Sequence, residues 1–337
     1  MQHVVFGAGL IGGYLGGVLT HLEQDTRLIG RDSTMSRWQP GLRLSDYQGH
    51  QAGPLKLQIQ GSDWRETAVP CDVLWLTVKC THLAQTAVDI APLVGEKTVI
   101  LCCQNGIGSD ALIKAIFPRN QVLRVMVPFN VVETVPGCLH RGSEGKLTLE
   151  SDASGLVRAL VSLLDCDLMP IDCTSAMTPL QWAKLQLNLG NAVNALADIP
   201  VKSMLEQRGY RLVLAALMDE LLTLCKVKGI KLPRLTRVPA SWLPLVLRLP
   251  DGLFSRLARQ MLAIDPQVRT SMWWDLSQGK DTEIAYLNGA VIEQALSLGL
   301  DCRVNQAIVA LVHQAEQGRL KPGLSATKLM ERAGIIH

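Results

Sequence analysis

The chain has 337 residues, of which 48% are hydrophobic and 19% are charged, so it can bury a large core and is not a disordered chain. The net charge is only +3, and no basic stripe is interleaved with aromatic residues, which argues against a nucleic-acid partner. No charge-free apolar segment reaches about 18 residues, so we expect no transmembrane helix and no membrane partner.

The numbers and spacing of the cysteines and histidines indicate whether disulfides or a metal site are expected. The nine cysteines are an odd number without a Cys-x-x-Cys pair, which indicates free thiols in a reducing compartment. The chain starts directly with a strand-like run and lacks the charged and apolar regions of a signal peptide, so a cytoplasmic protein is expected. The seven histidines are scattered, and we predict no metal site.

The chain begins with a predicted strand at residues 2–6, followed by a G-x-G-x-x-G pattern and a helix that extends to about Leu22. In such a loop the first glycine permits a tight turn, the second lets the backbone approach a pyrophosphate, and the third lets helix and strand pack closely. The N-terminus of the helix favours phosphate. The pattern therefore predicts a dinucleotide site built by Gly7, Ala8, Gly9, Leu10, Ile11 and Gly12.

The second strand, at about Thr26–Ile29, leads into Gly30-Arg31-Asp32. An NAD site usually has an acid at the end of this strand, to bind the ribose 2′-hydroxyl. Here the guanidinium of Arg31 suits a 2′-phosphate better, so the sequence favours NADP(H) over NAD. Asp32 could still turn toward the ribose, and Arg31 could be an ordinary solvated charge.

Polar side chains follow two further apolar strands. The first is the strand predicted at Cys71–Lys79, whose last residue is Lys79. The second is the strand predicted at 98–103, which is followed by Gln104-Asn105-Gly106. In open α/β sheets ligands bind at the carboxyl ends of the strands, so Lys79 and Asn105 are placed to meet cofactor or substrate. The alternative for Asn105 is a plain Asn-Gly turn. The sequence also predicts an antiparallel hairpin or excursion at 40–69 and strands at 122–129, 145–149 and 168–171. Helices are expected at 83–93 and 155–165, and a further helix is expected to begin at Ser109-Asp110, which would cap it.

From about Thr174 the strand signals largely stop. The fold class is therefore predicted as α/β: a Rossmann-type, doubly wound sheet in residues 1–172, followed by an all-α domain in residues 173–337. Residues 233–250 contain four prolines and are interpreted as an irregular surface connection, with a membrane-adsorbing or dimer-contact role as the alternative. The helices expected in the second domain are 179–197, 208–228, 252–264, 281–299 and 303–317.

Lys184, Asn188 and Asn191 fall on one face of the helix predicted at 179–197, at relative angles of roughly 0, 40 and −20 degrees. Burying an ammonium and two amides is costly unless a ligand or the fold satisfies them. The alternative is that Lys184 pairs with an acid in the core. Glu283 is expected in the first turn of the helix at 281–299, capped by Asp281 or Thr282, where an ordinary N-terminal acid is the alternative.

Together these motifs resemble the ketopantoate reductase (2-dehydropantoate 2-reductase) family of NADPH-dependent enzymes. The resemblance spans nearly the whole chain, in five spaced motifs. They are Gly7-Ala8-Gly9-Leu10-Ile11-Gly12, Val78-Lys79, Gln104-Asn105-Gly106-Ile107-Gly108, Trp182-Ala183-Lys184-Leu185 with Asn188, and Asp281-Thr282-Glu283-Ile284-Ala285-Tyr286-Leu287-Asn288-Gly289.

The resemblance implies reduction of 2-dehydropantoate (ketopantoate) to (R)-pantoate, in pantothenate and coenzyme A biosynthesis. The resemblance implies that Lys184 is the general acid and that Glu283 is the acid that helps to position the lysine and the substrate. It also implies that Arg31 binds the 2′-phosphate of the cofactor. The residues expected to bind substrate, with Asn191 included for its place on the Lys184 face, are Asn105, Lys184, Asn188, Asn191, Ser271 and Glu283. Those expected to bind the cofactor are Gly7, Ala8, Gly9, Leu10, Ile11, Gly12, Arg31, Lys79 and Asn105.

One departure concerns the substrate. Well-known members carry a second asparagine eight residues after the lysine, where this chain has Ala192. Another small branched 2-oxo acid is therefore an alternative substrate. A non-catalytic NADP(H)-binding regulator is a further alternative, against which the presence of both Lys184 and Glu283 argues. The sequence leaves a homodimer open as an assembly.

Overall fold

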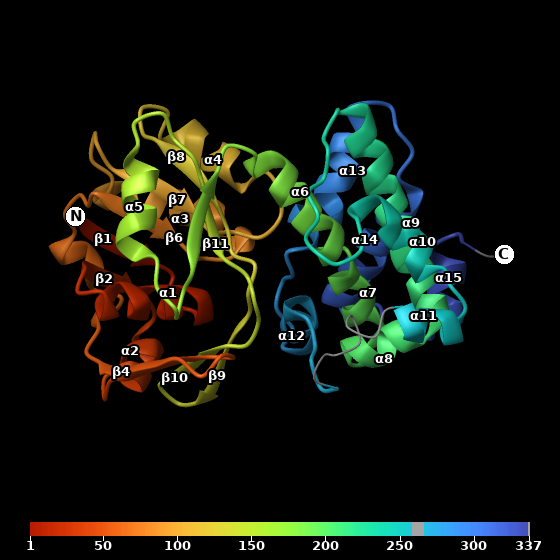
Figure 1. Ribbon diagram of the computed structural model, residues 1–337, viewed down its shortest axis with the longest axis horizontal. Helices are drawn as coiled ribbons and strands as arrows, with labels where there is room; N and C mark the ends of the chain where they lie inside the picture. Colours follow the sequence, from red (N-terminus) through yellow and green to blue (C-terminus); the bar gives the residue numbers. More distant parts are fainter. Residues whose placement is uncertain (258–265, 336–337) are drawn as a thin grey trace. The chain divides into compact units, whose positions relative to one another are not determined.

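The computed structural model describes residues 1–257 and 266–335, and the chain divides into two compact units (Figure 1). The first, Met1–Met177, combines a sheet with helices, and the second, Thr178–His337, is helical. The predicted fold class, an α/β sheet region followed by an all-α region, is therefore confirmed.

The first unit is organised by an eight-stranded sheet. Neighbouring strands run parallel except for the pair β8 and β11, which is antiparallel, so the predicted parallel sheet with antiparallel additions is confirmed. In spatial order the strands are β12 (Ile171–Thr174), β11 (Leu147–Glu150), β8 (Val122–Met126), β7 (Val99–Cys102), β6 (Val73–Leu76), β1 (Gln2–Phe6), β2 (Asp25–Ile29) and β5 (Gln58–Gln60).

Successive side chains of the central strands point to opposite faces of this sheet, because a strand alternates with a period of two. Val5 and Trp75 belong to one apolar core, and Val4 and Leu74 belong to the other. Both faces are covered, which explains why these strands are continuous apolar runs. The helices on the first face are α1 (Leu10–His21) and α5 (Leu156–Leu164), and those on the second are α3 (Leu83–Asp89) and α4 (Ser109–Ile116).

The predicted excursion at residues 40–69 contributes an antiparallel hairpin, β3–β4, to a second sheet of four strands, whose other two strands come from residues 131–141. At the end of the excursion, β5 joins the main sheet beside β2. The strands of the second sheet, in spatial order, are β4 (Gln51–Leu55), β3 (Leu42–Asp46), β10 (Cys138–Arg141) and β9 (Val131–Val135), and the helix α2 (Asp32–Trp38) precedes it. Arg141 of β10 pairs with Asp46 of β3 at 3.0 Å, both side chains being almost fully buried.

The Asp46 carboxylate also accepts hydrogen bonds from the backbone N–H of His50 and from its Nδ1, each at 2.9 Å. Burial of this carboxyl group raises its pKa, but the hydrogen bonds from His50 and Arg141 outweigh burial and lower the pKa to about 2. The same hydrogen bond with Asp46 raises the pKa of His50. The β3–β4 turn is thus held by a charged cluster at its base.

Several boundaries in the first unit differ from the sequence prediction; the strand expected at 122–129, for example, ends at Met126. The strand expected at 168–171 lies at Ile171–Thr174, because Met169 still belongs to a turn closed by its hydrogen bond to the Cys166 carbonyl. The helix α4 is capped by Gly108, at φ +97°, so Ser109 and Asp110 lie in its first turn and do not cap it. The helix expected at 83–93 ends at Asp89 and is followed by a 3₁₀ turn with Pro92.

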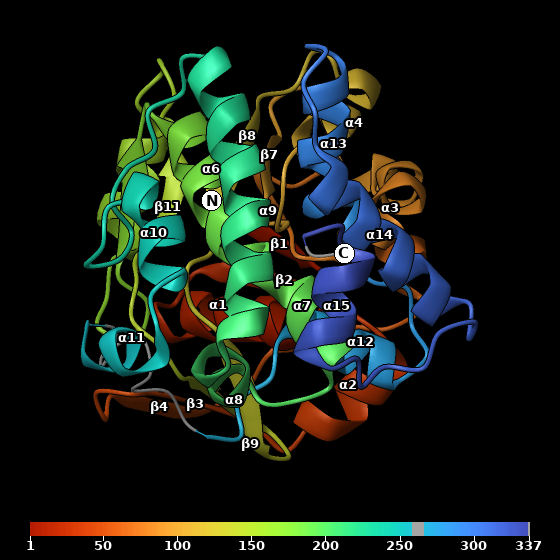
Figure 2. The ribbon, with the colours of Figure 1, turned by 90° about the vertical axis from the view of Figure 1, so that its right-hand side faces the viewer.

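In the second unit α9 packs against α7, α10, α13, α14 and α15 (Figure 2). The helices expected at 208–228 and 303–317 are confirmed. The helices of this unit are α6 (Met177–Asn188), which begins one residue before it, α7 (Gly190–Ala197), α8 (Val201–Glu206), α9 (Arg208–Val227), α10 (Leu243–Leu247), α11 (Asp251–Leu257), α12 (Ser271–Ser277), α13 (Asn288–Leu296), α14 (Arg303–Glu316) and α15 (Ala326–Arg332).

The stretch at 233–250, expected to be irregular, contains a 3₁₀ turn at Ala240–Trp242 and the helix α10. Its end is ordered by the buried Arg211 of α9, whose guanidinium donates to the carbonyls of Leu247 and Leu249. The sequence pattern missed this anchor because Arg211 comes from a distant helix. The helix expected at 252–264 starts one residue earlier as α11, and its part beyond Leu257 lies outside the described residues.

The helix expected at 179–197 is two helices, α6 and α7, interrupted at Leu189. Gly190 weakens the helix, and a Cβ there would lie 3.1 Å from a methyl group of Leu214, so glycine permits close packing against α9. The helix expected at 281–299 begins only at Asn288, after a 3₁₀ turn at Ile284–Tyr286.

Within residues 1–257 and 266–335 no helix is both long and apolar enough to cross a membrane. The nine cysteines all lie in this part of the chain, and every one is a free thiol.

Candidate functional site

The glycine loop connects β1 to α1 in the first unit. Gly7 adopts φ +112°, a left-handed conformation that favours glycine, and a Cβ there would lie 2.8 Å from the amide nitrogen of Val78. A Cβ on Gly12 would lie 2.2 Å from the carbonyl oxygen of Gly7. A Cβ on Gly9, in contrast, would meet no atom within 4 Å. The first and third glycines are therefore required by packing, and the second faces open space.

Thr77, which follows β6, fixes this loop. Its Oγ1 lies 2.8 Å from the carbonyl oxygen of Gly7 and 3.1 Å from that of Phe6. On the other side, the amides of Gly7 and Ala8 both donate to the carbonyl of Ile29 at 3.0 Å. The loop is thus tied to both neighbouring strands before any ligand binds. Sequence reasoning missed Thr77, because it lies in the middle of a run interpreted only as a strand.

A hollow of about 420 Å³ lies beside the loop, where β1, β2 and β5 end. The carboxyl ends of parallel strands are the usual place for ligands in such sheets. The residues that line it are Phe6, Ala8, Gly9, Ile29, Gly30, Arg31, Asp32, Gly61, Ser62, Trp64 and Arg65. We call this hollow the nucleotide pocket, because its size, glycine loop and two arginines fit the phosphate-bearing half of a dinucleotide.

Arg31 lies in the wall of the nucleotide pocket, and its role toward a 2′-phosphate stays a prediction. Asp32, which could have turned toward a ribose, instead accepts hydrogen bonds from Ser62 through both carboxylate oxygens. Arg65 donates to Asp89 at 2.6 Å, and its guanidinium carbon lies 5.0 Å from the ring centre of Trp64. Sequence reasoning missed Ser62 and Arg65, because the three-residue strand β5 that carries them to the pocket is too short to give a clear pattern.

Lys79 and Asn105 follow the adjacent strands β6 and β7, although β6 ends at Leu76 and not, as predicted, in Lys79 itself. The Cys80 thiol donates to the backbone carbonyl of Asn105 at 3.2 Å, which joins the two strand ends. The buried Gln104 amide adds a second link, because its Nε2 donates to the carbonyl of Leu76 at 2.8 Å. The ends of β6 and β7 therefore lie together at one edge of the sheet, and the contacts of Lys79 and Asn105 with a ligand stay predictions.

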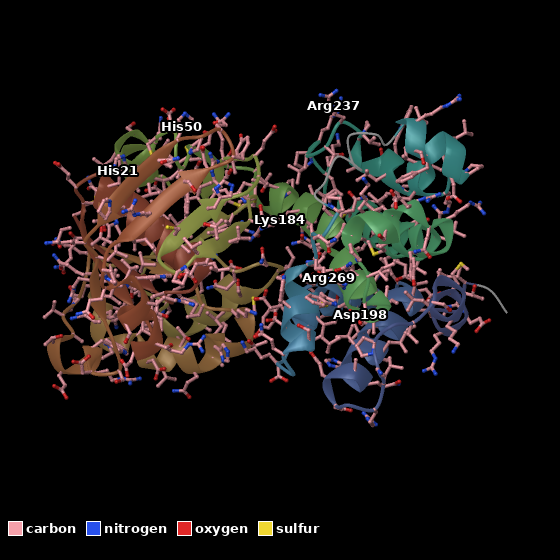
Figure 3. The ribbon with its side chains drawn as sticks, turned by 90° about the horizontal axis from the view of Figure 1, so that it is seen from below. His21, His50, Lys184, Asp198, Arg237 and Arg269 are labelled. Atoms are coloured by element: carbon pink, nitrogen blue, oxygen red, sulfur yellow. The ribbon has the colours of Figure 1, made fainter. Side chains whose placement is uncertain are left out.

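In the second unit Lys184 and Asn188 lie one turn apart on α6, and both are half-buried. Trp182 and Leu185 on either side are buried, so the helix packs with its apolar residues and leaves the Lys184 face partly open. Figure 3 labels Lys184 on this helix. Leu189 separates α6 from α7 but keeps helical backbone angles, and its N–H donates to the carbonyl of Leu185 at 3.0 Å, so the place of Asn191 on the Lys184 face stays a prediction.

The backbone carbonyl of Asn191 accepts a hydrogen bond from the hydroxyl of Thr270, which caps α12 and precedes Ser271. The buried Asn194 of α7 accepts hydrogen bonds at its Oδ1 from the backbone N–H of Thr270 at 3.1 Å and from its hydroxyl at 3.0 Å. Its Nδ2 donates to the carbonyl of Ile199. We call these contacts the α7–α12 clamp. Ser271 is the first residue of α12 and is exposed beside the clamp.

A second set of contacts strengthens the α7–α12 clamp at the end of α7. Asp198 pairs with Arg269 at 3.1 Å and accepts a hydrogen bond from the indole nitrogen of Trp273 at 2.6 Å. Arg269 also stacks over the Trp273 ring, 4.1 Å from its centre. Figure 3 shows Arg269 and Asp198 close together in the helical unit. The start of α12 is therefore fixed against α7 by polar side chains.

Glu283 is almost fully buried just before the 3₁₀ turn that precedes α13, and not in the first turn of a helix. The preceding residue, Thr282, donates from its backbone N–H and its hydroxyl to Glu316 of α14, each at 2.8 Å. Burial raises the pKa of Glu316, but these two donors and His313 outweigh it and lower the pKa. This anchor fixes the backbone that carries Glu283.

In the described ranges, 1–257 and 266–335, no group of three or more His, Cys, Asp or Glu side chains is placed to hold a metal ion. The predicted cofactor residues belong to the first unit, and Lys184, Asn188, Asn191, Ser271 and Glu283 belong to the second.

Two family models match the chain. The model of ketopantoate reductase PanE/ApbA matches residues 3–153, and that of its C-terminal region matches residues 176–316. A 2-dehydropantoate 2-reductase of Halobacterium salinarum is 26% identical over 329 residues, which cover 94% of this chain and 99% of that protein.

Solved structures give the same result for the fold. A PanE/ApbA family ketopantoate reductase from Ralstonia eutropha superposes with a TM-score of 0.79 at 24% identity, over 95% of this chain and 99% of that one. D-mandelate dehydrogenase with NADH and anilino(oxo)acetate superposes with a TM-score of 0.76 at 19% identity, over 95% and 99%.

Proposed function

The chain belongs to the ketopantoate reductase family, and from this premise we propose that it reduces 2-dehydropantoate to (R)-pantoate with NADPH, in the pathway to pantothenate and coenzyme A. The observation that carries the proposal is the match of both family models, in order, to a chain whose candidate residues fall inside them. Lys184 and Glu283 lie in the second matched region, and the glycine loop lies in the first.

The first unit would hold the cofactor. The open space at Gly9 leaves room for a pyrophosphate at the N-terminus of α1, and Arg31, in the pocket wall, would bind a 2′-phosphate. Lys79 and Asn105, at the next two strand ends, would contact the part of the cofactor that lies nearer the substrate. When bound, NADPH supplies the hydride that the reduction requires.

The second unit would supply the proton and the substrate contacts. The Lys184 ammonium would donate a hydrogen bond to the C2 carbonyl oxygen, stabilise the negative charge that develops there, and transfer a proton to the resulting alkoxide. Asn188, Asn191 and Ser271 carry donors suited to the substrate hydroxyl and carboxylate. Glu283, fixed through Thr282, would orient the lysine and the substrate.

The test is a set of initial rates of NADPH and NADH oxidation across a panel of 2-oxo acids. We expect 2-dehydropantoate to have the highest kcat/KM, and NADPH to be preferred over NADH. A panel in which another acid ranks far above 2-dehydropantoate would exclude the proposed substrate. Absence of turnover with every acid, together with tight NADPH binding, would support the non-catalytic regulator.

A second candidate function is the same reduction on another small branched 2-oxo acid. Ala192, which stands where well-known members have an asparagine, favours it, because this buried methyl group offers no hydrogen bond. The Ala192→Asn variant separates the two candidates. It should lower KM for 2-dehydropantoate if that acid is the substrate and the asparagine contact is merely missing. A rise in KM would favour the other acid.

A further inference from the structure

We propose that Ser62 is a specificity-determining residue, which makes the nucleotide pocket prefer a 2′-phosphate to a free 2′-hydroxyl by holding the carboxylate of Asp32. The inference rests on the proposed function in one respect, namely that the ligand of this pocket is a pyridine dinucleotide. The contacts that carry it lie entirely within the first unit.

Ser62 engages both oxygens of the Asp32 carboxylate. Its backbone N–H donates to Oδ1 at 2.9 Å, and its hydroxyl donates to Oδ2 at 3.0 Å. Asp32 is the first residue of α2, whereas Ser62 follows β5, thirty residues later in the chain. Both residues line the nucleotide pocket and are exposed there. A two-point contact between separate elements fixes the direction of the carboxylate, which a single contact would not.

A carboxylate near the end of the second strand is the group that accepts the ribose 2′-hydroxyl in NAD sites. When both of its oxygens are used by Ser62, Asp32 has less capacity to accept that hydroxyl. Its negative charge is also partly compensated by two donors, which reduces its repulsion of a phosphate. Holding Asp32 therefore weakens the pocket for a 2′-hydroxyl and strengthens it for a 2′-phosphate.

The opposite charge on the pocket wall comes from two arginines that flank the Asp32–Ser62 pair in sequence. Arg31 precedes Asp32, and within the described part of the chain its side chain forms no ion pair. Arg65 follows Ser62 by three residues and is oriented by its ion pair with Asp89 and by stacking over Trp64. Ser62 thus acts on the one acid among the pocket-lining residues, and leaves the two guanidinium groups to determine the ligand.

The test measures binding without turnover, with 2′,5′-ADP and 5′-AMP as probes in titration calorimetry of the full chain. In the Ser62→Ala variant the Asp32 carboxylate loses one of its two donors. We expect the ratio of the dissociation constants, 5′-AMP over 2′,5′-ADP, to fall by roughly three- to tenfold, the effect of one ordinary hydrogen bond at an exposed site. In the Asp32→Ala background the same serine substitution should change this ratio less than twofold.

Ser36→Ala is the matched control. Ser36 is exposed like Ser62, but it lies on α2. Its hydroxyl donates a hydrogen bond to the backbone carbonyl of Asp32 and not to the carboxylate. The control should leave the ratio unchanged. An unchanged ratio in Ser62→Ala would overturn the proposal, and so would an equal fall in the Asp32→Ala background, since Ser62 would then contact the ligand directly.

These results are distinguishable from failure of the proposed reaction. If Ser62→Ala shows the expected fall in the ratio but the unmodified protein turns over no 2-oxo acid, the role of Ser62 is supported and the proposed reaction is excluded. If neither probe binds the unmodified protein, both the pocket assignment and the role of Ser62 are wrong.

Discussion

The glycine loop of the first unit and the α7–α12 clamp of the second are both rigid, but they are built in opposite ways. In the loop, backbone atoms approach so closely that a Cβ on Gly12 would lie 2.2 Å from a carbonyl oxygen. In the clamp, one buried amide, Asn194, holds the start of α12 through its side-chain atoms. Adding atoms to the loop should therefore destabilise it, whereas removing side-chain atoms from the clamp should destabilise the clamp.

The largest expected effect separates the chemistry of the two units. Lys184→Ala should lower kcat by about 10²- to 10⁴-fold, because a positioned general acid contributes roughly that factor. The affinity for 2′,5′-ADP should stay within twofold, since the nucleotide pocket belongs to the other unit. Stopped-flow NADPH oxidation and calorimetry measure the two quantities. Lys226→Ala, on the exposed surface of α9, is the control, and undiminished turnover in Lys184→Ala would remove this lysine from the mechanism.

The next effect tests the loop by adding one methyl group at two positions. Gly12→Ala should lower the free energy of unfolding by roughly 1–3 kcal/mol, because the new Cβ would overlap the Gly7 carbonyl. Gly9→Ala should change the free energy of unfolding by less than about 1 kcal/mol, since its Cβ meets no protein atom. It should instead weaken 2′,5′-ADP binding. Denaturant unfolding and calorimetry give both numbers, and equal loss of stability in the two variants would contradict the packing argument.

The clamp is tested by removing atoms. Asn194→Ala leaves the Thr270 amide and the Ile199 carbonyl without their partner, and should lower the free energy of unfolding by about 1–3 kcal/mol. Because Ser271 begins α12, KM for the 2-oxo acid should rise while 2′,5′-ADP affinity stays unchanged. Asn191→Ala is the comparison, since only its backbone carbonyl bonds to Thr270, so it should keep stability. A stable Asn194→Ala variant would show that the clamp does not hold α12.

The smallest effect concerns pH and the β3–β4 turn. The pKa of His50 is raised by its hydrogen bond to Asp46, so its contribution to stability is complete below about pH 6.5, the ordinary pKa of histidine. That contribution is lost as the pH rises through the higher pKa of the folded state. The stability difference between the unmodified chain and His50→Gln should therefore shrink between pH 6 and pH 9. A stability difference that grows as the pH rises would contradict the stabilising interaction between protonated His50 and Asp46.

Much of the first unit could be predicted from sequence, because buried parallel strands are continuous apolar runs and their ends carry informative residues. Lys79, Asn105 and Arg31 follow the ends of β6, β7 and β2, as the apolar runs indicated, and what they bind stays a prediction. The pattern missed Ser62, since β5 has only three residues, and Thr77, since its role depends on the carbonyls of a loop seventy residues away.

The second unit was less predictable, because helical periodicity does not show where a helix is interrupted. Gly190 follows the interruption at Leu189, and its lack of a side chain permits close packing against Leu214 of a distant helix. The late start of α13 depends on Glu316 of α14, which binds Thr282 and holds the preceding backbone out of a helix. The roles of Lys184 and Glu283 came from resemblance, and they remain predictions that the variants above test.

The eleven residues that line the nucleotide pocket all come from Phe6–Arg65, an unbroken stretch at the beginning of the chain. Cofactor preference in this protein should therefore be transferable by recombination, as one cassette exchanged between homologous chains. Two supports lie outside the cassette, namely Thr77 beneath the glycine loop and Asp89 beside Arg65. A chimera that retains a hydroxyl and a carboxylate at these two positions should bind the cofactor with the preference of the inserted cassette. A chimera that lacks them should contain the same pocket residues, but its glycine loop and Arg65 should not be held in position.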